Sequence, residues 1–215
     1  MPKGGKMNRI EVLDGQGWIE LTDHMGDELR IVDTARIAYG GRSNNLSESD
    51  LAVLEGLLKN GHTSPLEHVV FTFHAYAPIF VVRHWFRHRS WSYSELSRRY
   101  TRKDIAFYTP SHFNGDGVAE EDKAACQSRM IKAAMAAVDL YHELLGKGVK
   151  PEQARTVLPV SLMTEFYATV DLNNLLKFLS LRCDQHAQWE IRQYAEAIKP
   201  LVSGILPHVA RFLGW

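Results

Sequence analysis

The chain is organised around one polar stretch, Arg87-His88-Arg89-Ser90-Trp91-Ser92-Tyr93-Ser94-Glu95-Leu96-Ser97-Arg98-Arg99-Tyr100, which follows the apolar run Ala77-Pro78-Ile79-Phe80-Val81-Val82. Pro78 suits the first turn of a helix, where its missing N–H costs nothing, so we expect a helix from Pro78 to about Arg89. At about 100° per residue, one face of this helix collects four basic side chains, Arg83, His84, Arg87 and His88. Because like charges one turn apart repel each other, this face is expected to lie opposite an anion.

Hydroxyl groups and one carboxylate follow the basic face, at Ser90, Ser92, Ser94, Glu95 and Ser97. Arg98 and Arg99 then add two planar guanidinium groups, each of which can hold a pair of phosphate oxygens. A cluster of charges more often marks a solvated surface than a binding site. Here aromatic side chains border the charges, and a merely solvated face does not need them, so a binding site is the better interpretation.

The composition predicts one globular domain with no bias toward nucleic acid or membranes. The 215 residues are 45% hydrophobic, which is enough for a full core. Lys plus Arg and Asp plus Glu number 25 each, so no net charge favours the coating of nucleic acid or binding to a membrane surface. We expect residues 1–8 to be a flexible tail and residues 9–215 to form the domain.

The two cysteines, Cys126 and Cys183, are too few for a disulfide framework in a chain of this size, which favours a reducing compartment. No apolar run approaches the roughly 18 residues that a membrane span needs. Residues 1–6 lack the apolar segment of a signal peptide. The expectation is therefore a soluble, cytoplasmic protein.

Hydrophobic periodicity and turn residues predict an α+β (α/β mixed) fold, in which long helices flank a central antiparallel-type sheet. Strands are expected at residues 10–13, 18–21, 69–76, 106–108 and 162–170. Further helices are expected at residues 26–39, 120–145 and 151–158, after a capping box of Ser47 and Asp50, after a cap at Asp171, and from Asp184 to Pro207. The helix at 120–145 is expected to bury its alanines, Met130, Ile131, Met135, Val138 and Leu145.

The pattern R-H-R-x-x-S-x-x-E-x-S-x-R-Y resembles the signature of the flavin-dependent (alternative) thymidylate synthases, and it is far more specific than a single glycine motif. All of its fixed positions are filled, by Arg87, His88, Arg89, Ser92, Glu95, Ser97, Arg99 and Tyr100. Three further blocks, at residues 61–68, 152–159 and 171–188, look like family blocks in the family's order. The resemblance therefore covers about residues 10–200.

The resemblance implies a reductive methylation of dUMP to dTMP. NADPH reduces FAD, methylenetetrahydrofolate donates its one-carbon unit, and the reduced flavin supplies the hydride, leaving tetrahydrofolate. Members of the family need no cysteine nucleophile, and we expect no metal. They are homotetramers of α/β subunits with active sites built across subunits, so the resemblance also implies a homotetramer with shared sites.

The resemblance implies site residues as well. FAD would be bound by Ser64, Glu67, Arg87, His88, Arg89, Glu95, Asn173, Lys177 and His186. The dUMP would be bound by His84, Arg87, Glu95, Leu96, Ser97, Arg98, Arg99, Arg155 and Arg182. Catalytic roles would fall to His62, Ser97 and Arg182, the last of which contacts the uracil in the family and favours ionisation at its N3. The chain departs from the common family pattern at Ala38, His84 and Ser94, where members carry a hydroxyl residue, Gln and Asn.

Arg182 interrupts an apolar helix, where an unpaired guanidinium would be unfavourable. The alternative to a catalytic role is a structural ion pair with Asp184 or Glu95. On the residues alone, without the resemblance, that ion pair is the more common explanation of such an arginine.

Two functions from other classes are also compatible with the residues. A nucleic-acid-binding module would use arginines on phosphates and aromatic rings on bases, at Arg83, Arg87, Arg98, Arg99, Arg102, Trp91, Tyr93 and Tyr100. A metal-dependent hydrolase would use His84 and His88 with His62 or His68. Against the hydrolase, the H-E-x-x-H motif is absent and the neighbouring arginines would repel a cation.

Overall fold

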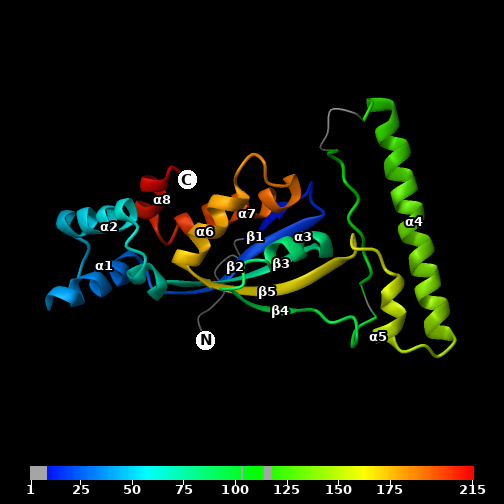
Figure 1. Cartoon of the computed structure of the whole chain (residues 1–215), viewed down its shortest axis with the longest axis horizontal. Coiled ribbons are helices and arrows are strands. Elements are labelled where there is room, and N and C mark those ends of the chain that lie inside the picture. Colours follow the sequence, from blue (N-terminus) through cyan, green and yellow to red (C-terminus); the bar gives the residue numbers. More distant parts are fainter. Residues whose placement is uncertain (1–8, 103, 114–117) are drawn as a thin grey trace.

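The computed structural model describes residues 9–102, 104–113 and 118–215, so the expected tail at residues 1–8 lies outside the described part of the chain. Within that part, the centre of the molecule is a five-stranded antiparallel sheet with the order β1-β2-β3-β5-β4 (Figure 1). Its strands are β1 (Arg9–Val12), β2 (Gly17–Met25), β3 (Val70–Pro78), β4 (Ser92–Glu95) and β5 (Met163–Asp171). The mixed α+β class and the antiparallel sheet are as predicted.

Helices cover one face of this sheet (Figure 1). They are α3 (Ile79–Trp85), α6 (Leu172–Arg182) and α7 (Trp189–Ser203), and α8 (Pro207–Leu213) packs on α7. Beyond one end of the sheet stand α1 (Glu28–Arg36) and α2 (Glu48–Asn60), and at the other end stand α4 (Glu120–Gly146) and α5 (Pro151–Ala154) (Figure 1). Short 3-10 turns are η1 (Ile37–Tyr39), η2 (Ser64–His68) and η3 (Arg155–Val157). None of the helices in the described ranges combines the length and the hydrophobicity that a membrane crossing requires.

Buried and half-buried side chains alternate along β3, because successive side chains of a strand point to opposite faces of the sheet. Phe71 and Phe73 are fully buried, whereas Thr72 and His74 on the opposite face are half-buried. The buried face packs on the helices through an aromatic cluster around the fully buried Trp85 of α3, formed by Trp91, Phe166, Phe178 and Tyr194. Because this cluster holds the last residue of α3, the core fixes the point at which the polar signature segment begins.

Helix ends follow the local signals in the sequence. Ser47 and Asp50 form the predicted capping box of α2, and Gly61 ends that helix with φ 66° in the left-handed region. The Asp171 side chain accepts the backbone N–H of Asn174 at the start of α6, 2.9 Å away. The predicted hairpin, the strands at β3 and β5, and the helices at α1, α4, α6 and α7 are also confirmed.

The helix expected from Pro78 to about Arg89 is shorter in the structure. Pro78 ends β3 and caps α3, which stops at Trp85, so Arg87 and His88 follow the helix instead of sharing a face with Arg83 and His84. The helix stops because the Trp85 side chain is locked in the core while its carbonyl accepts the N–H of His88, 3.0 Å away, in a tight turn. The expectation of one continuous basic helix face is wrong.

Two strand expectations also need correction. Residues 92–95 form β4, an edge strand paired with β5, which the polar sequence does not predict. Conversely, residues 106–108 join no strand of the sheet, and Phe107 makes only an isolated bridge with Leu162. Both are tertiary effects, because each pairing depends on β5 lying alongside.

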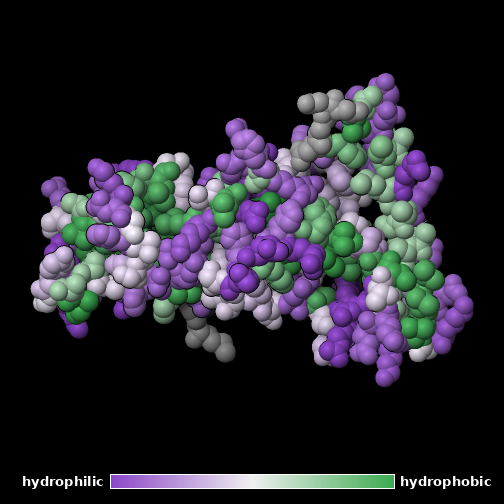
Figure 2. Space-filling view, viewed as in Figure 1, coloured by the Kyte–Doolittle hydropathy of each residue, from purple (hydrophilic) through white to green (hydrophobic). Residues whose placement is uncertain are grey.

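The side chains expected to be buried on α4 are largely exposed. Met130, Ile131 and Met135 have exposed fractions of 47%, 45% and 62%, and Figure 2 shows hydrophobic residues at the surface along this helix. The buried residues of α4 are Ala134 and Tyr141. The predicted helix is present, and Val138 and Leu145 are half-buried, but the expected burial of Met130, Ile131 and Met135 is wrong for the described part of the chain.

Candidate active site

The signature begins with a turn between α3 and β4, residues 86–91, which has neither helical nor strand structure. The Tyr93 hydroxyl, from β4, lies 3.0 Å from the Trp85 carbonyl oxygen and 2.9 Å from the His88 carbonyl oxygen. Arg87 and Arg89 are exposed on this turn, whereas His88 is half-buried. The turn therefore presents two guanidinium groups to solvent and directs one imidazole inward.

The imidazole of His88 meets Arg182 at the C-terminal end of α6. Arg182 Nε donates to His88 Nε2 over 3.1 Å, and Arg182 Nη2 donates to the His84 carbonyl oxygen over 3.3 Å. Since a ring nitrogen that accepts a hydrogen bond carries no proton, His88 is neutral in this arrangement. Burial, and then the charge of Arg182, lower the pKa of His88, which favours the same state.

The structural ion pair considered for Arg182 is not formed within the described residues. Asp184 instead binds the backbone N–H and the Nδ1 of His186, at 2.7 and 2.9 Å. Glu95 accepts a hydrogen bond from the Thr164 hydroxyl, 2.9 Å away. Arg182 therefore keeps its charge next to neutral partners, which leaves it able to bind an anion.

A second part of the predicted site is a cavity of about 440 Å³ beyond the end of β4. Five sequence-predicted residues line it: Glu95, Leu96, Ser97, Arg98 and Arg155. The backbone after β4 is held by the Leu96 N–H, which donates to the Glu165 carbonyl oxygen over 2.8 Å. Arg98 is only 7% exposed and donates to the Asp104 carbonyl oxygen over 2.8 Å. The volume and the two guanidinium groups suit a small phosphorylated ligand.

Sequence reasoning missed several residues of this cavity. Thr164 and Leu162 come from the start of β5 and the turn before it, and Thr156 and Leu158 come from η3 and its end. Thr164 is buried, and its hydroxyl orients Glu95. Thr164 reaches Glu95 because β5 pairs with β4, and this pairing cannot be predicted from the sequence alone.

Arg99 lies at the rim of this region and does not line the cavity. Its Nε is 3.5 Å from an oxygen of Glu152, and its guanidinium lies 5.4 Å from the ring centre of the exposed Tyr100. Both partners of the ion pair are about half exposed, so it is worth little and is easily exchanged for another anion.

Of the residues expected to bind the flavin, Ser64 and Glu67 lie on η2 and Asn173 and Lys177 on α6, on the helical side, whereas Arg87, His88 and Arg89 lie on the turn and Glu95 lies on β4. His62 and Ser64 line a cavity of about 600 Å³ with residues of α1, η1 and α2, Ala38 among them. Asn173 and Lys177 line a neighbouring hollow of about 430 Å³. The Asn173 amide donates to Glu67 over 3.0 Å, and His186 is exposed. These amide, hydroxyl and cationic groups fit a large anionic cofactor laid along an open surface.

The structure does not bring all predicted nucleotide-binding residues together. The cavity beside Glu95 contains neither His84 nor Arg87 nor Arg182. Arg182 instead bonds His88 and the His84 carbonyl oxygen, and Arg87, whose backbone N–H also donates to that oxygen over 3.4 Å, lies next to them with its side chain exposed. Within the described part of one chain, the predicted site is therefore two half-sites, which we call the Glu95 cavity and the Arg182 cluster.

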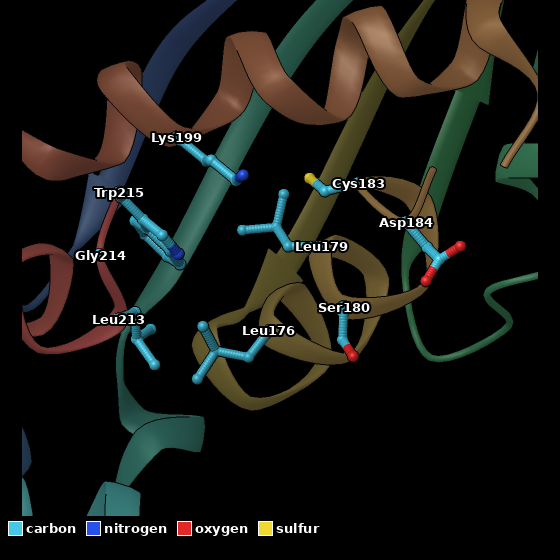
Figure 3. A pocket seen from close by; sticks show the side chains of 9 residues that line it. All are labelled: Leu176, Leu179, Ser180, Cys183, Asp184, Lys199, Leu213, Gly214 and Trp215. Carbon is cyan, nitrogen blue, oxygen red and sulfur yellow. The ribbon is translucent and has the colours of Figure 1, made fainter. Parts of the chain in front are cut away.

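The cysteines do not resemble nucleophiles. Cys126 is exposed on α4, and Cys183 lies with Lys199 and Trp215 in a pocket of about 510 Å³ between α6, α7 and residues 213–215 (Figure 3). Burial raises the pKa of Cys183 to about 11, so this group is a neutral thiol near pH 7.

The geometry gives little support to the two alternative functions, a metal-dependent hydrolase and a nucleic-acid-binding module. Within the described ranges, no group of three or more His, Cys, Asp or Glu side chains is placed to hold a metal ion. Of the three rings proposed to stack on bases, Trp91 is 5% exposed in the core and the Tyr93 ring lies 4.1 Å from that of Phe86 between ring centres, so neither is free to stack. Tyr100 is exposed.

Comparisons of the chain with family models, with curated proteins and with solved structures agree with one another. Residues 20–208 match the family model described as thymidylate synthase complementing protein. The chain is 45% identical over 207 residues to a flavin-dependent thymidylate synthase of Thermus thermophilus, a match that covers 92% of this chain and 75% of the relative. It is 46% identical over 192 residues to that of Thermotoga neapolitana, covering 88% and 87%. Among solved structures, the UMP/dUMP methylase PolB from Streptomyces cacaoi, bound with 5-Br dUMP, has a TM-score of 0.85 at 32% identity, covering 92% of this chain and 94% of that one.

Proposed function

This chain belongs to the family of flavin-dependent thymidylate synthases, enzymes that methylate dUMP to dTMP, and we propose that its Glu95 cavity binds the dUMP. The cavity has the volume of a small-ligand site and contains the guanidinium groups of Arg98 and Arg155, which suit a dianionic phosphate. The Ser97 hydroxyl and the backbone at Leu96 supply further polar contacts at its wall.

We place FAD along the helical side, because the residues there suit it. Arg87, Arg89 and Lys177 would neutralise its diphosphate, and Ser64, Glu67, His88, Glu95, Asn173 and His186 would complete its contacts, with His62 beside the flavin and the folate. When bound and reduced by NADPH, FAD supplies the hydride, while methylenetetrahydrofolate supplies the carbon. The protein's own contribution is to orient these molecules and to balance their charge.

The role of Arg182 is to stabilise negative charge that develops on the uracil ring. Its guanidinium is half-buried, and its Nε is oriented by the neutral His88 ring, so it meets an anion without a competing carboxylate. His84 and Arg87 belong to the same half-site as further nucleotide contacts. The raised pKa of Cys183 fits chemistry that needs no thiolate.

The two half-sites are completed between copies of the chain. In the proposed homotetramer, the Arg182 cluster of one copy would face the Glu95 cavity of another, which would join the nucleotide-binding residues that one chain keeps apart. The exposed Met130, Ile131 and Met135 on α4 support such an assembly, since large exposed apolar patches on a protein often mark protein–protein interfaces.

The observation that carries the proposal is the complete signature, with Glu95 and Ser97 lining a cavity that also holds Arg98 and Arg155. The test is to incubate the purified protein with FAD, NADPH, methylenetetrahydrofolate and dUMP, and to measure dTMP. Omission of dUMP provides the control. A folded protein that binds no FAD by its visible absorption spectrum, at any concentration tested, would refute the proposed cofactor.

A further inference from the structure

The turn at residues 86–91 carries three signature residues. The Phe86 N–H continues the helix by donating to the Val82 carbonyl oxygen over 2.8 Å, and the His88 N–H donates to the Trp85 carbonyl oxygen over 3.0 Å. Two further backbone hydrogen bonds of the turn, from the Arg87 N–H to the His84 carbonyl oxygen and from the Trp91 N–H to the His88 carbonyl oxygen, are both 3.4 Å, which is long for this type. A turn built in this way needs another contact to hold one conformation.

The Tyr93 hydroxyl provides that contact. It lies 3.0 Å from the Trp85 carbonyl oxygen and 2.9 Å from the His88 carbonyl oxygen. Carbonyl oxygens only accept, and a phenol has one hydrogen, so that hydrogen is shared between the two acceptors. The hydroxyl thus ties the last residue of α3 to the middle of the turn.

The Tyr93 ring is itself firmly placed. Tyr93 is in β4, where it pairs with Ala168 of β5, and its ring contacts Phe86 at 4.1 Å between ring centres. Burial raises the pKa of Tyr93 well above its ordinary value, so the hydroxyl keeps its proton and remains a donor. The sheet therefore supports the middle of the turn through Tyr93, while the core holds its two ends through Phe86 and Trp91.

From these contacts we propose that Tyr93 is a positioning residue, whose hydroxyl fixes the turn at 86–91 so that the His88 ring can orient Arg182. The proposal rests on the function proposed above for Arg182. Two residues beyond Tyr93 the chain reaches Glu95, the first residue of the other half-site. The same side chain thus sets the position of the turn relative to β4, from which the Glu95 cavity begins.

Two other tyrosines provide matched controls. The Tyr194 hydroxyl donates to the Tyr76 carbonyl oxygen over 2.7 Å, in the core and not on the turn. The Tyr141 hydroxyl is buried on α4 and has no hydrogen-bond partner among the described residues. Tyr194→Phe therefore removes a hydrogen bond elsewhere, and Tyr141→Phe removes a hydroxyl without one.

The first test is hydrogen exchange by mass spectrometry on the full chain, which needs no substrate. Tyr93→Phe should speed exchange in peptides spanning residues 86–91 by about fivefold, the factor for one neutral hydrogen bond, and leave the rest of the chain unchanged. Tyr194→Phe and Tyr141→Phe should not affect those peptides. Unchanged exchange at 86–91, or faster exchange throughout the chain with a larger fall in melting temperature than in Tyr194→Phe, would overturn the proposal.

The second test is a double-mutant cycle on the rate of dTMP formation at saturating substrates. Tyr93→Phe should slow the parent about fivefold but slow Arg182→Ala less than twofold, because a residue that acts through Arg182 has no further effect once Arg182 is gone. Equal effects in both backgrounds would show that Tyr93 does not act through Arg182. A parent that makes no dTMP would instead refute the proposed function, and the exchange experiment would still test the role of Tyr93 in the turn.

Discussion

Replacement of Arg182 by alanine separates binding from chemistry. The change removes two hydrogen bonds, to His88 Nε2 and to the His84 carbonyl oxygen. Each is worth roughly 1 kcal/mol net in the folded protein, and water can replace part of that because Arg182 is half-buried. Loss of about 2 kcal/mol at most leaves a typical domain folded. The variant should therefore keep its fold.

The effect on the reaction should be much larger. One charge-assisted contact to charge that develops in a water-poor site is worth roughly 3 kcal/mol, or about a hundredfold or more in rate. In the proposed reaction, the reduction of the flavin by NADPH does not involve the pyrimidine, so Arg182→Ala should reduce flavin at close to the parent rate. In single-turnover experiments, the bleaching of the flavin and the formation of dTMP should thus respond differently to the same substitution.

Two comparison variants make the test specific. Arg211→Ala on α8, where the arginine contacts only His208 in the described structure, should behave like the parent in both steps. Arg155→Ala, at the wall of the Glu95 cavity, should raise the dUMP concentration required by about tenfold, with a smaller effect at saturation. If Arg182→Ala makes dTMP like the parent at saturating substrates, or if it simply unfolds, the reasoning fails and Arg182 is a structural residue.

Three further predictions follow from the cysteines, the histidines and α4. The double variant Cys126→Ala, Cys183→Ala should still make dTMP, because the pKa of Cys183 is raised to about 11; a folded, flavin-loaded variant with no turnover would instead indicate thiolate catalysis. Burial lowers the pKa of His84 and His88 from 6.5, so the unfolded chain binds more protons and the melting temperature should fall as the pH drops below about 6.5. His84→Gln should weaken that dependence, and an identical pH profile would contradict its assignment. If the proposed homotetramer forms through α4, Met135→Lys should dissociate it in size-exclusion chromatography at unchanged helix content, whereas Ala125→Lys, at another exposed position of α4, should not.

Much of the fold could be predicted because its signals are local. The capping box of Ser47 and Asp50, the cap at Asp171 and the glycine after α2 each act within a few residues, so the sequence places those helix ends correctly. Alternation in β3 and β5 reflects burial of one face, which the residue types record directly.

The end of α3 could not be predicted, because nothing near Trp85 in sequence terminates a helix. The chain turns there since Trp85 is enclosed by aromatic residues of β5, α6 and α7, and since a hydroxyl from β4 binds its carbonyl oxygen. The same tertiary contacts create β4 from a run of polar residues. Local periodicity continues the helix to Arg89 because it contains no information about those partners.

The candidate site was likewise predicted only in part. The resemblance of the signature predicts roles for Arg87, His88, Glu95 and Ser97, and the structure places Glu95 and Ser97 in a cavity with Arg155, far along the chain. The signature does not show that His88 turns away from that cavity to accept a hydrogen bond from Arg182. In the proposed assembly, a second copy of the chain would bring its Arg182 cluster to the Glu95 cavity, and the exposed apolar residues of α4 would then matter for catalysis. Under the proposed assembly, a substitution such as Met135→Lys, remote from both half-sites, should therefore abolish dTMP formation while leaving each chain folded.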